Sequence, residues 1–146
     1  MIQRIQSVFL LLAALGFGGL FFLPFATSPQ QDAVLFADLS YNLKDHIILL
    51  ILAAVGVLGS LSAIFLFRNR LTQLRISYLT VIAAILLVVV GVVLFLNGTK
   101  TSSIAAQQIE DGAGLYLIPV IIVVLFLAIR GINKDEKTVR SMDRLR

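Results

Sequence analysis

The sequence contains no cysteine and no tryptophan, and it has a single histidine, His46. Without cysteine the chain has no disulfide, no thiolate nucleophile and no iron–sulfur ligand. One histidine is too few for a paired-histidine haem or a multi-histidine zinc site within one chain. No nucleophile–base pair and no glycine-rich phosphate loop stands out either. We therefore expect a protein that is not an enzyme and that holds no cofactor or metal.

Charge is also absent from four long apolar runs, at roughly residues 7–25, 47–67, 76–96 and 115–129. The whole chain is 59% hydrophobic and 14% charged, with a mean hydropathy of +0.99. A membrane span needs about 20 apolar residues, each rising 1.5 Å, to cross roughly 30 Å of hydrocarbon. The sequence thus predicts an all-α membrane protein: one domain over residues 1–146, built as a bundle of four transmembrane helices.

Lysine and arginine gather on alternate sides of these runs, and ten of the 12 fall on one side. Cytoplasmic loops accumulate such residues, so we predict that both termini are cytoplasmic and that loops 27–45 and 97–114 lie outside. The ten are Arg4, Arg68, Arg70, Arg75, Arg130, Lys134, Lys137, Arg140, Arg144 and Arg146, and the two on the other side are Lys44 and Lys100.

Small residues recur at steps of three and four within the first three runs, which places them on single helix faces. Small side chains let membrane helices approach closely. We interpret them mainly as packing positions inside the bundle, and alternatively as a dimer or partner-subunit interface. They are Ala14, Gly18, Ala53, Gly56, Ser60, Ala63, Ser77, Thr80, Ala84 and Gly91.

The first outer loop alternates apolar and polar residues over 35–44, apart from Phe36, as in a half-buried strand. We expect a short strand or extended cap there, with residues around 99–104 as its partner; an irregular segment on the membrane surface is the alternative. In the fourth run, Pro119 predicts a kink or a helix that starts near Tyr116.

His46 adjoins Asp45 at the outer mouth of the second run, and Glu110 and Asp111 precede the fourth. An imidazole and three carboxylates are possible ligands for a divalent cation. Solvated helix ends carry such residues anyway, and a carboxylate near a helix N-terminus is favourable in itself. We therefore expect no metal site here.

The tail from residue 130 reads RGINKDEKTVRSMDRLR, and as a helix it has a basic face beside an apolar strip. Its net charge of +3 is too mixed for a nucleic-acid-binding arm. It is either a cytoplasmic helix that lies along anionic lipid headgroups or a docking helix for a partner. The expected contact residues are Arg130, Lys134, Lys137, Arg140 and Arg144.

The opening MIQRIQSVFLLLAAL and the ending AIRGINKDEKTVRSMDRLR together resemble an uncharacterised family of small four-span inner-membrane proteins of Bacteroidota. The resemblance covers the whole chain. It implies the four-span layout and a bacterial inner-membrane location, and it transfers no catalytic residue, because the family is a domain of unknown function.

Three functions remain open from the sequence. The first is a non-enzymatic accessory or scaffold subunit that contacts the bilayer and a membrane-protein partner or a second copy. The second is a small oligomeric channel or transporter with Ser60, Ser62 and Thr80 along its path. The third is a membrane enzyme or lipid-binding protein that uses His46 and the outer carboxylates.

Overall fold

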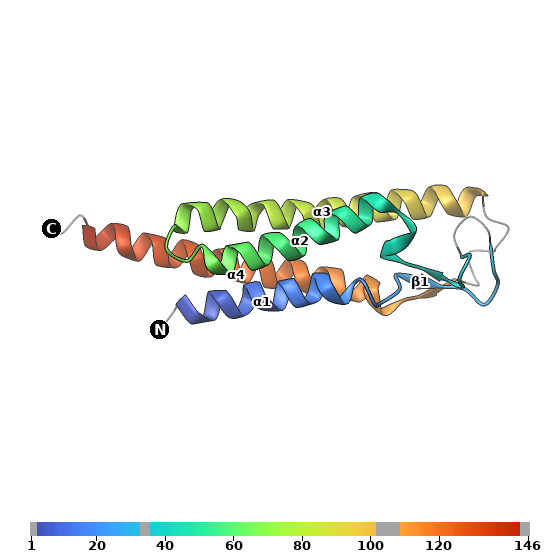
Figure 1. Cartoon of the computed structure of the whole chain (residues 1–146), viewed down its shortest axis with the longest axis horizontal. Helices are drawn as coiled ribbons and strands as arrows, with labels where there is room; N and C mark the ends of the chain where they lie inside the picture. Colours follow the sequence, from blue (N-terminus) through green and yellow to red (C-terminus); the bar gives the residue numbers. More distant parts are fainter. Residues whose placement is uncertain (1–2, 33–35, 102–108, 144–146) are drawn as a thin grey trace.

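The computed structural model describes residues 3–32, 36–101 and 109–143, and it shows four helices capped at one end by short strands. The helices lie side by side, with the start of α1, the end of α4 and the α2–α3 connection at one end (Figure 1). We call this the terminal end, and we call the opposite end, which carries the strands, the sheet end. The helices are α1 (Gln3–Gly19), α2 (Ile47–Phe65), α3 (Arg70–Thr101) and α4 (Ala113–Asp143).

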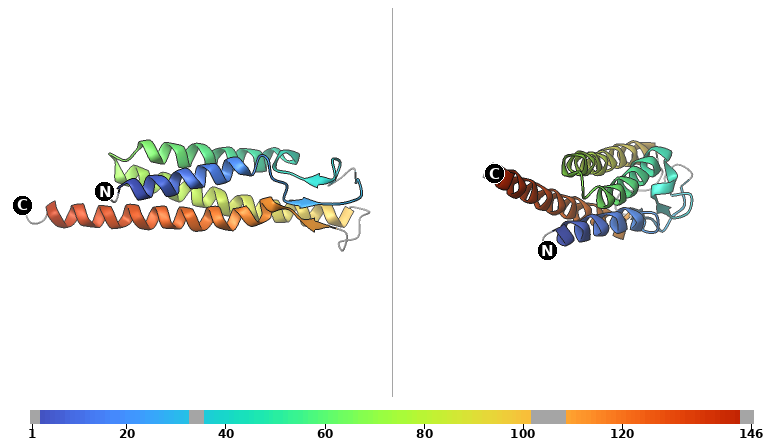
Figure 2. Two further views of the ribbon diagram at one scale, coloured as in Figure 1. Left: turned by 90° about the horizontal axis from the view of Figure 1, so that it is seen from below. Right: turned by 60° about the vertical axis from the view of Figure 1, so that its left-hand side comes forward.

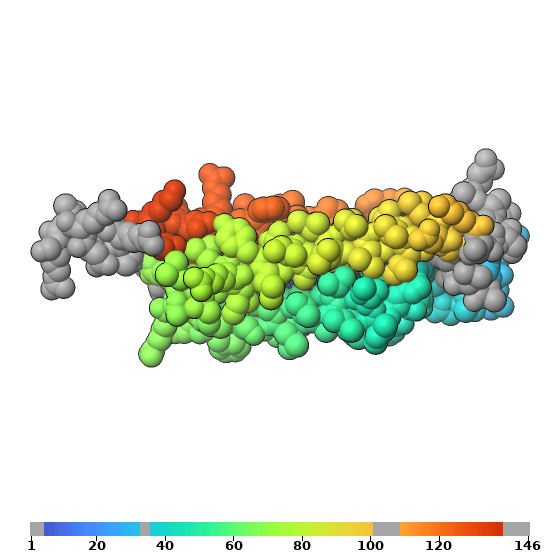
Figure 3. Space-filling view, turned by 90° about the horizontal axis from the view of Figure 1, so that it is seen from above, coloured from blue at the N-terminus to red at the C-terminus, as the bar shows by residue number. Residues whose placement is uncertain are grey.

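Each helix packs against two others, so the four close around a common core (Figure 2). Helix α1 contacts α2 and α4, and α3 lies between α2 and α4 (Figure 3). Large side chains such as Phe17, Leu49, Leu87 and Leu125 fill the core and are almost completely buried. This closed arrangement buries one stripe of every helix and leaves the other faces apolar and exposed.

Three helices, α2, α3 and α4, are long and apolar enough to cross a membrane, whereas the apolar part of α1, Ile5–Gly19, is shorter. Their exposed surfaces carry large apolar side chains, among them Ile51, Ile82 and Val123. Such a surface is stable against lipid, and helices satisfy every backbone hydrogen bond within the hydrocarbon. The predicted all-α fold with four helices is confirmed, and three of these helices are long and apolar enough to span a membrane.

The first apolar run, at roughly 7–25, is helical only as far as Gly19, where α1 ends. The amides of Phe21 and Phe22 bond only three residues back, to Gly18 and Gly19, which tightens the last turn. Pro24 then disfavours further helix, and the chain leaves the bundle as an extended segment.

The third helix, in contrast, is longer than the run predicted at 76–96 after a connection over 68–75, because α3 begins at Arg70 and ends at Thr101. Asn69 caps it: its side-chain oxygen accepts the Thr72 amide at 3.3 Å and its carbonyl accepts the Gln73 amide. Only residues 66–69 separate α2 from α3. In the fourth run the helix begins at Ala113 rather than near Tyr116, and Pro119 lies within it.

Three two-residue strands close the sheet end in the order β2-β1-β3, all antiparallel. The central strand β1 (Ala26–Thr27) pairs with β2 (Ser40–Tyr41) and with β3 (Glu110–Asp111). Ala26 lies opposite both Tyr41 and Asp111. A strand in the first outer loop was therefore predicted correctly, but at greater length.

The partner predicted for that strand, around 99–104, is wrong. Residues up to Thr101 belong to α3, and residues 102–104 lie outside the described part of the chain. The alternating apolar and polar residues over 35–44 do not form one continuous strand, because Leu39 adopts a left-handed backbone conformation, with φ 63°, that interrupts an extended strand. The segment that follows Pro24 instead supplies β1, the partner of β2, so the extension of α1 takes the place assigned to the second outer loop.

Candidate functional site

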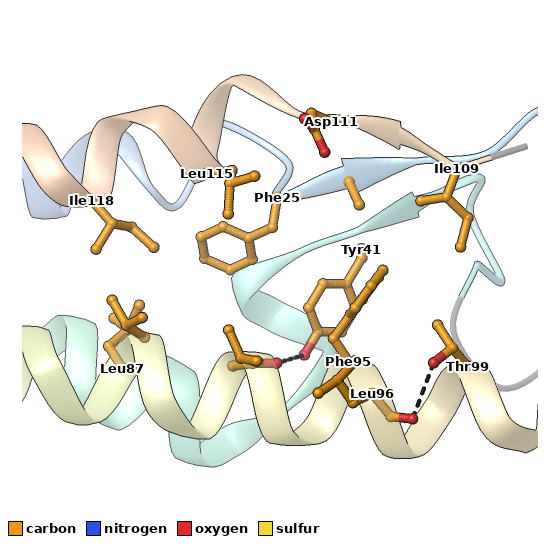
Figure 4. A pocket seen from close by; sticks show the side chains of 14 residues that line it. Phe25, Tyr41, Leu87, Phe95, Leu96, Thr99, Ile109, Asp111, Leu115 and Ile118 are labelled. Carbon is orange, nitrogen blue, oxygen red and sulfur yellow. Dashed lines mark hydrogen bonds between the residues drawn. The ribbon is translucent and has the colours of Figure 1, made fainter. Parts of the chain in front are cut away.

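A cavity of about 360 Å³ lies at the sheet end between α3, the first turns of α4 and the three strands. Its floor is formed by Phe25, Tyr41, Leu87 and Ile118, all of them buried. Figure 4 shows these side chains converging on one space from the strands and from both helices. We call it the sheet-end pocket, and its other principal lining residues are Ala26, Val88, Gly91, Val92, Phe95, Leu96, Thr99, Ile109, Asp111 and Leu115.

The strands deliver aromatic rings to this pocket. The amide of Phe25 donates to the carbonyl of Tyr41 at 2.8 Å, which fixes the two segments beside each other. The Tyr41 ring lies 6.1 Å from Phe25, 5.5 Å from Phe95 and 5.9 Å from His46, measured between ring centroids. These spacings are typical of tilted aromatic packing, so the ring of Tyr41 joins the sheet to α3.

The Tyr41 hydroxyl donates to the main-chain carbonyl of Gly91 on α3, at 3.4 Å (Figure 4). Burial, and secondarily the charge of Asp45, raises the pKa of Tyr41 to about 12. The pKa of Asp45 is also raised, chiefly because the carboxyl is partly buried. The nearby charge of Asp38 raises it further, whereas the hydrogen bond from the Asn42 amide and the proximity of His46 act in the opposite direction. The phenol therefore stays protonated over the whole physiological pH range and serves as a fixed donor.

Two glycines bring the start of α4 against the end of the α1 extension. The amide of Gly112 donates to Phe25 at 2.9 Å, and that of Gly114 donates to Pro24 at 2.8 Å. A Cβ at Gly112 would overlap the Pro24 carbonyl, and one at Gly114 would lie within 2.8 Å of it. The short Gly-Ala-Gly sequence before the fourth run was the only signal of this approach.

Besides the Tyr41 hydroxyl and the Gly91 carbonyl, the pocket has few polar groups. The Thr99 hydroxyl donates to the carbonyl of Leu96 at 3.0 Å, and a carboxylate oxygen of Asp111 accepts the Tyr116 hydroxyl at 3.0 Å. Among residues 3–32, 36–101 and 109–143, no three His, Asp or Glu side chains gather to hold a metal ion. The arrangement of His46, Glu110 and Asp111 considered from the sequence is thus not assembled.

The small residues singled out in the sequence lie mostly inside the packed helices. A Cβ at Gly56 would collide with the Phe17 ring of α1. A Cβ at Gly59 would collide with the Thr80 side chain of α3, and this glycine was not among the predicted packing positions. Gly18 has open space around it and, like Gly91, is half-buried. The buried members are Ala14, Ala53, Gly56, Ser60, Ala63, Ser77, Thr80 and Ala84.

The hydroxyl groups of α2 and α3 do not share one face. Thr80 donates to the carbonyl of Ser77 at 2.7 Å and is completely buried. Ser60 is also completely buried, and its hydroxyl has no hydrogen-bond partner among the described residues. Ser62 lies on the exposed side of α2. The three residues expected along a channel path therefore face different surroundings.

A second polar cluster, which sequence reasoning missed, lies at the terminal end. The side-chain amide of Gln6 on α1 donates to the buried carboxylate of Asp135 on α4, and Arg70 donates to the main-chain carbonyl of Asp135 at 2.7 Å. Gln73 donates to the carbonyl of Ala63 at 2.9 Å. These contacts join all four helices at the terminal end.

The basic tail residues expected to contact a partner or lipid belong to α4 beyond its apolar part. Arg130, Lys134 and Lys137 are exposed. The side chain of Arg140 and the whole of Arg144 lie outside the described part of the structure. Ile132, between the exposed residues, is completely buried, so this stretch of α4 has one packed face and one basic face.

A family model described as "Domain of unknown function (DUF4293)" matches residues 2–145. The chain belongs to this family. No curated protein and no solved structure matches this DUF4293 chain. The match spans the helices, the strands and both ends of the molecule, so the sheet-end pocket and the terminal cluster fall within the family domain.

Proposed function

We propose that this DUF4293 protein is a non-enzymatic accessory or scaffold subunit of the bacterial inner membrane, with both termini cytoplasmic. The main support for this proposal is the arrangement of helix α4. This helix continues past the other helices at the terminal end (Figure 2), and its basic residues Arg130, Lys134 and Lys137 are exposed while its opposite face is packed. A helix held in this way can present charged side chains to a partner without losing its own position.

The anchoring contacts lie just before the projecting part. Asp135 is buried against Gln6 of α1, and a Cβ at Gly131 would press on the Gln6 side chain. Lys134 and Lys137 lie on the exposed side of the same turns. Because the part of α4 around Gly131 and Asp135 is fixed by packing, little conformational entropy is lost when a partner binds the tail, which favours docking.

The two ends also differ in charge, which supports the orientation. Eight basic residues of the described chain belong to the terminal end, whereas Lys44 and Lys100 belong to the sheet end with five of the eight acidic residues. Lysine and arginine are retained on the cytoplasmic side of membrane helices. The terminal end is accordingly the cytoplasmic end in this proposal.

Co-purification with charge-reversed tails tests the scaffold role. The native protein is cross-linked in the membrane, extracted in mild detergent and compared with Lys134→Glu/Lys137→Glu, which reverses two exposed charges. We expect recovery of a specific partner to fall about tenfold, because opposed charges at an interface are repulsive. The matched control, Lys44→Glu/Lys100→Glu, reverses two exposed lysines at the sheet end and should leave recovery unchanged.

Two outcomes contradict the proposal. One is a wild-type protein that is recovered alone under conditions that keep other membrane complexes intact. The other is a partner whose recovery falls equally in both charge-reversed variants, because that would indicate a general effect of charge rather than docking on α4.

The channel alternative gains less support from the arrangement. Ser60 and Thr80 are sealed within the helices and Ser62 faces outward, so one chain offers no continuous row of hydroxyls. Proteoliposomes loaded with a K⁺-sensitive or anion-sensitive dye provide the check: flux above that of empty vesicles would favour the channel over the scaffold.

A further inference from the structure

We propose that the sheet-end pocket binds one acyl chain of an amine-bearing membrane lipid, with the ammonium group of that lipid beside Asp111. The chain would enter from the leaflet on the sheet-end side. This site is separate from the tail surface of α4 and does not depend on the scaffold role.

The shape of the pocket favours a chain. Its lining residues on α3 extend from Leu87 to Thr99, which is about 18 Å along the helix at 1.5 Å per residue. Its volume of about 360 Å³ lies at the small end of the range for ligand pockets, about 300–1,000 Å³. A narrow, elongated space parallel to the helices suits an acyl chain aligned with its neighbours in the leaflet.

The chemistry of the walls favours a hydrocarbon. The deep part is formed by Leu87, Ile118 and the ring of Phe25. At the edge, Val92 and Leu96 of α3 and Leu115 of α4 are exposed on the apolar outer surface that faces lipid. A chain can therefore pass between α3 and α4 without leaving hydrocarbon, and most of the wall that it contacts there is apolar.

The charge near the mouth selects the headgroup. Asp111 lines the pocket at the level of the strands, and Glu110 is its neighbour on β3. The Asp111 carboxylate has about four lone-pair sites, so it can accept an ammonium group in addition to the Tyr116 hydroxyl. An amine is therefore favoured there over a headgroup with only negative charge.

Photo-cross-linking in defined vesicles tests this site. The protein is reconstituted in phosphatidylcholine vesicles containing a trace of phosphatidylethanolamine with a diazirine in one acyl chain, and cross-linked residues are mapped by peptide mass spectrometry. We expect labels concentrated on residues that line the pocket, such as Leu87, Val88 and Ile118. Unlabelled phosphatidylethanolamine should compete, and unlabelled phosphatidylglycerol should compete several-fold less.

Matched variants separate the pocket from the general lipid surface. Val92 and Val93 are neighbours on α3, 47% and 50% exposed, but only Val92 lines the pocket. Val92→Trp should reduce pocket labelling about tenfold by filling the space, and Val93→Trp should not. Asp111→Asn should weaken competition by phosphatidylethanolamine about threefold, as expected for a partly exposed ion pair, whereas Glu110→Gln should not.

Three results would overturn the proposal. Labels spread evenly over the exposed faces of α2, α3 and α4 would show that the pocket holds no chain. Equal labelling in the Val92→Trp and Val93→Trp proteins, both folded by circular dichroism, would show the same. Equal competition by phosphatidylglycerol would exclude the amine. None of these results affects partner recovery through α4, so the two proposals fail separately.

Discussion

The terminal end and the sheet end of this protein differ in charge, in hydrogen bonding and in packing. The terminal end is basic and is closed by side chains that reach between helices, such as Gln6 to Asp135 and Arg70 to the Asp135 carbonyl. The sheet end is acidic and is closed by main-chain bonds between short strands. Side-chain closure keeps the helices in direct contact, whereas strand closure holds α3 and α4 around a cavity.

This difference separates two roles within one small fold. Helix α4 can project from the terminal end because specific polar contacts at Asp135 fix the part of the helix that precedes the projection. The sheet end forms a pocket because the strands bridge a gap that the helices do not fill. Each of the following experiments alters one end and uses the other as its reference.

The largest expected effect is all-or-none, and it shows which side of the membrane each end of the molecule faces. Because the chain lacks cysteine, single cysteines at the exposed positions Lys137 and Asp38 can be labelled separately. In intact cells or spheroplasts, a membrane-impermeant maleimide should label Asp38→Cys and leave Lys137→Cys unlabelled until the membrane is opened. The opposite pattern would invert the orientation, and labelling of both would place the two ends on one side.

The second effect is on folding at the sheet end. Gly112→Ala places a Cβ against the Pro24 carbonyl, which must displace β3 or the start of α4. We expect a loss of about 3 kcal/mol or more in the free energy of unfolding, because main chain cannot yield as a flexible side chain does. Thermal unfolding followed by circular dichroism in detergent measures it.

Gly18→Ala is the matched control, because a Cβ there has no heavy atom within 4 Å. Alanine in a helix is favoured over glycine by about 0.5–1 kcal/mol, so this variant should be as stable as the wild type or more so. Equal destabilisation by the two substitutions would remove the argument that Gly112 holds the sheet end.

The third effect concerns the terminal end. Gln6→Leu removes the donor to the buried Asp135 carboxylate, so we expect a loss of about 1–3 kcal/mol in unfolding free energy. The double variant Gln6→Leu/Asp135→Leu removes both polar groups and should recover part of that loss. If the double variant is as unstable as the sum of its two single substitutions, the pair is not coupled.

The helices could be predicted from the sequence because membrane spans depend on local composition. An uncharged run such as 47–67 has few alternatives in hydrocarbon, where the backbone must bond to itself. Helix ends were less predictable. Gly19 ends α1 within an apolar run, and Asn69 starts α3 within a polar one, because both depend on capping and turn geometry rather than on hydropathy.

The sites depend on contacts that no local pattern records. Gln6 and Asp135 are 129 positions apart, and the pocket joins Tyr41, Phe95 and Asp111 from three segments. The small-residue spacing indicated where helices approach one another, but not which helix each residue faces: Gly56 lies against Phe17 of α1 and Gly59 against Thr80 of α3. Such pairings follow from the tertiary arrangement alone.

The smallest expected effect is the titration of Tyr41, where the sheet end meets α3. Its pKa in the folded protein, raised to about 12 by burial and by Asp45, exceeds that of an unfolded tyrosine, about 10. The folded state thus holds the phenolic proton more tightly. The resulting stability is fully present below about pH 10 and is lost as the pH rises through about 12. Tyr41→Phe removes this dependence along with the hydroxyl bond to Gly91.

We therefore expect Tyr41→Phe to cost about 0.5–1.5 kcal/mol at neutral pH, since the lost bond is long and leaves a helix carbonyl that already has a partner. In an ultraviolet titration of tyrosinate, the difference between wild type and Tyr41→Phe should be a single transition near pH 12. A difference transition near pH 10 would mean that the ring reaches water. In that case the strands would not keep water out of the pocket. The sheet end would then differ less from the terminal end than the contacts of Tyr41 indicate.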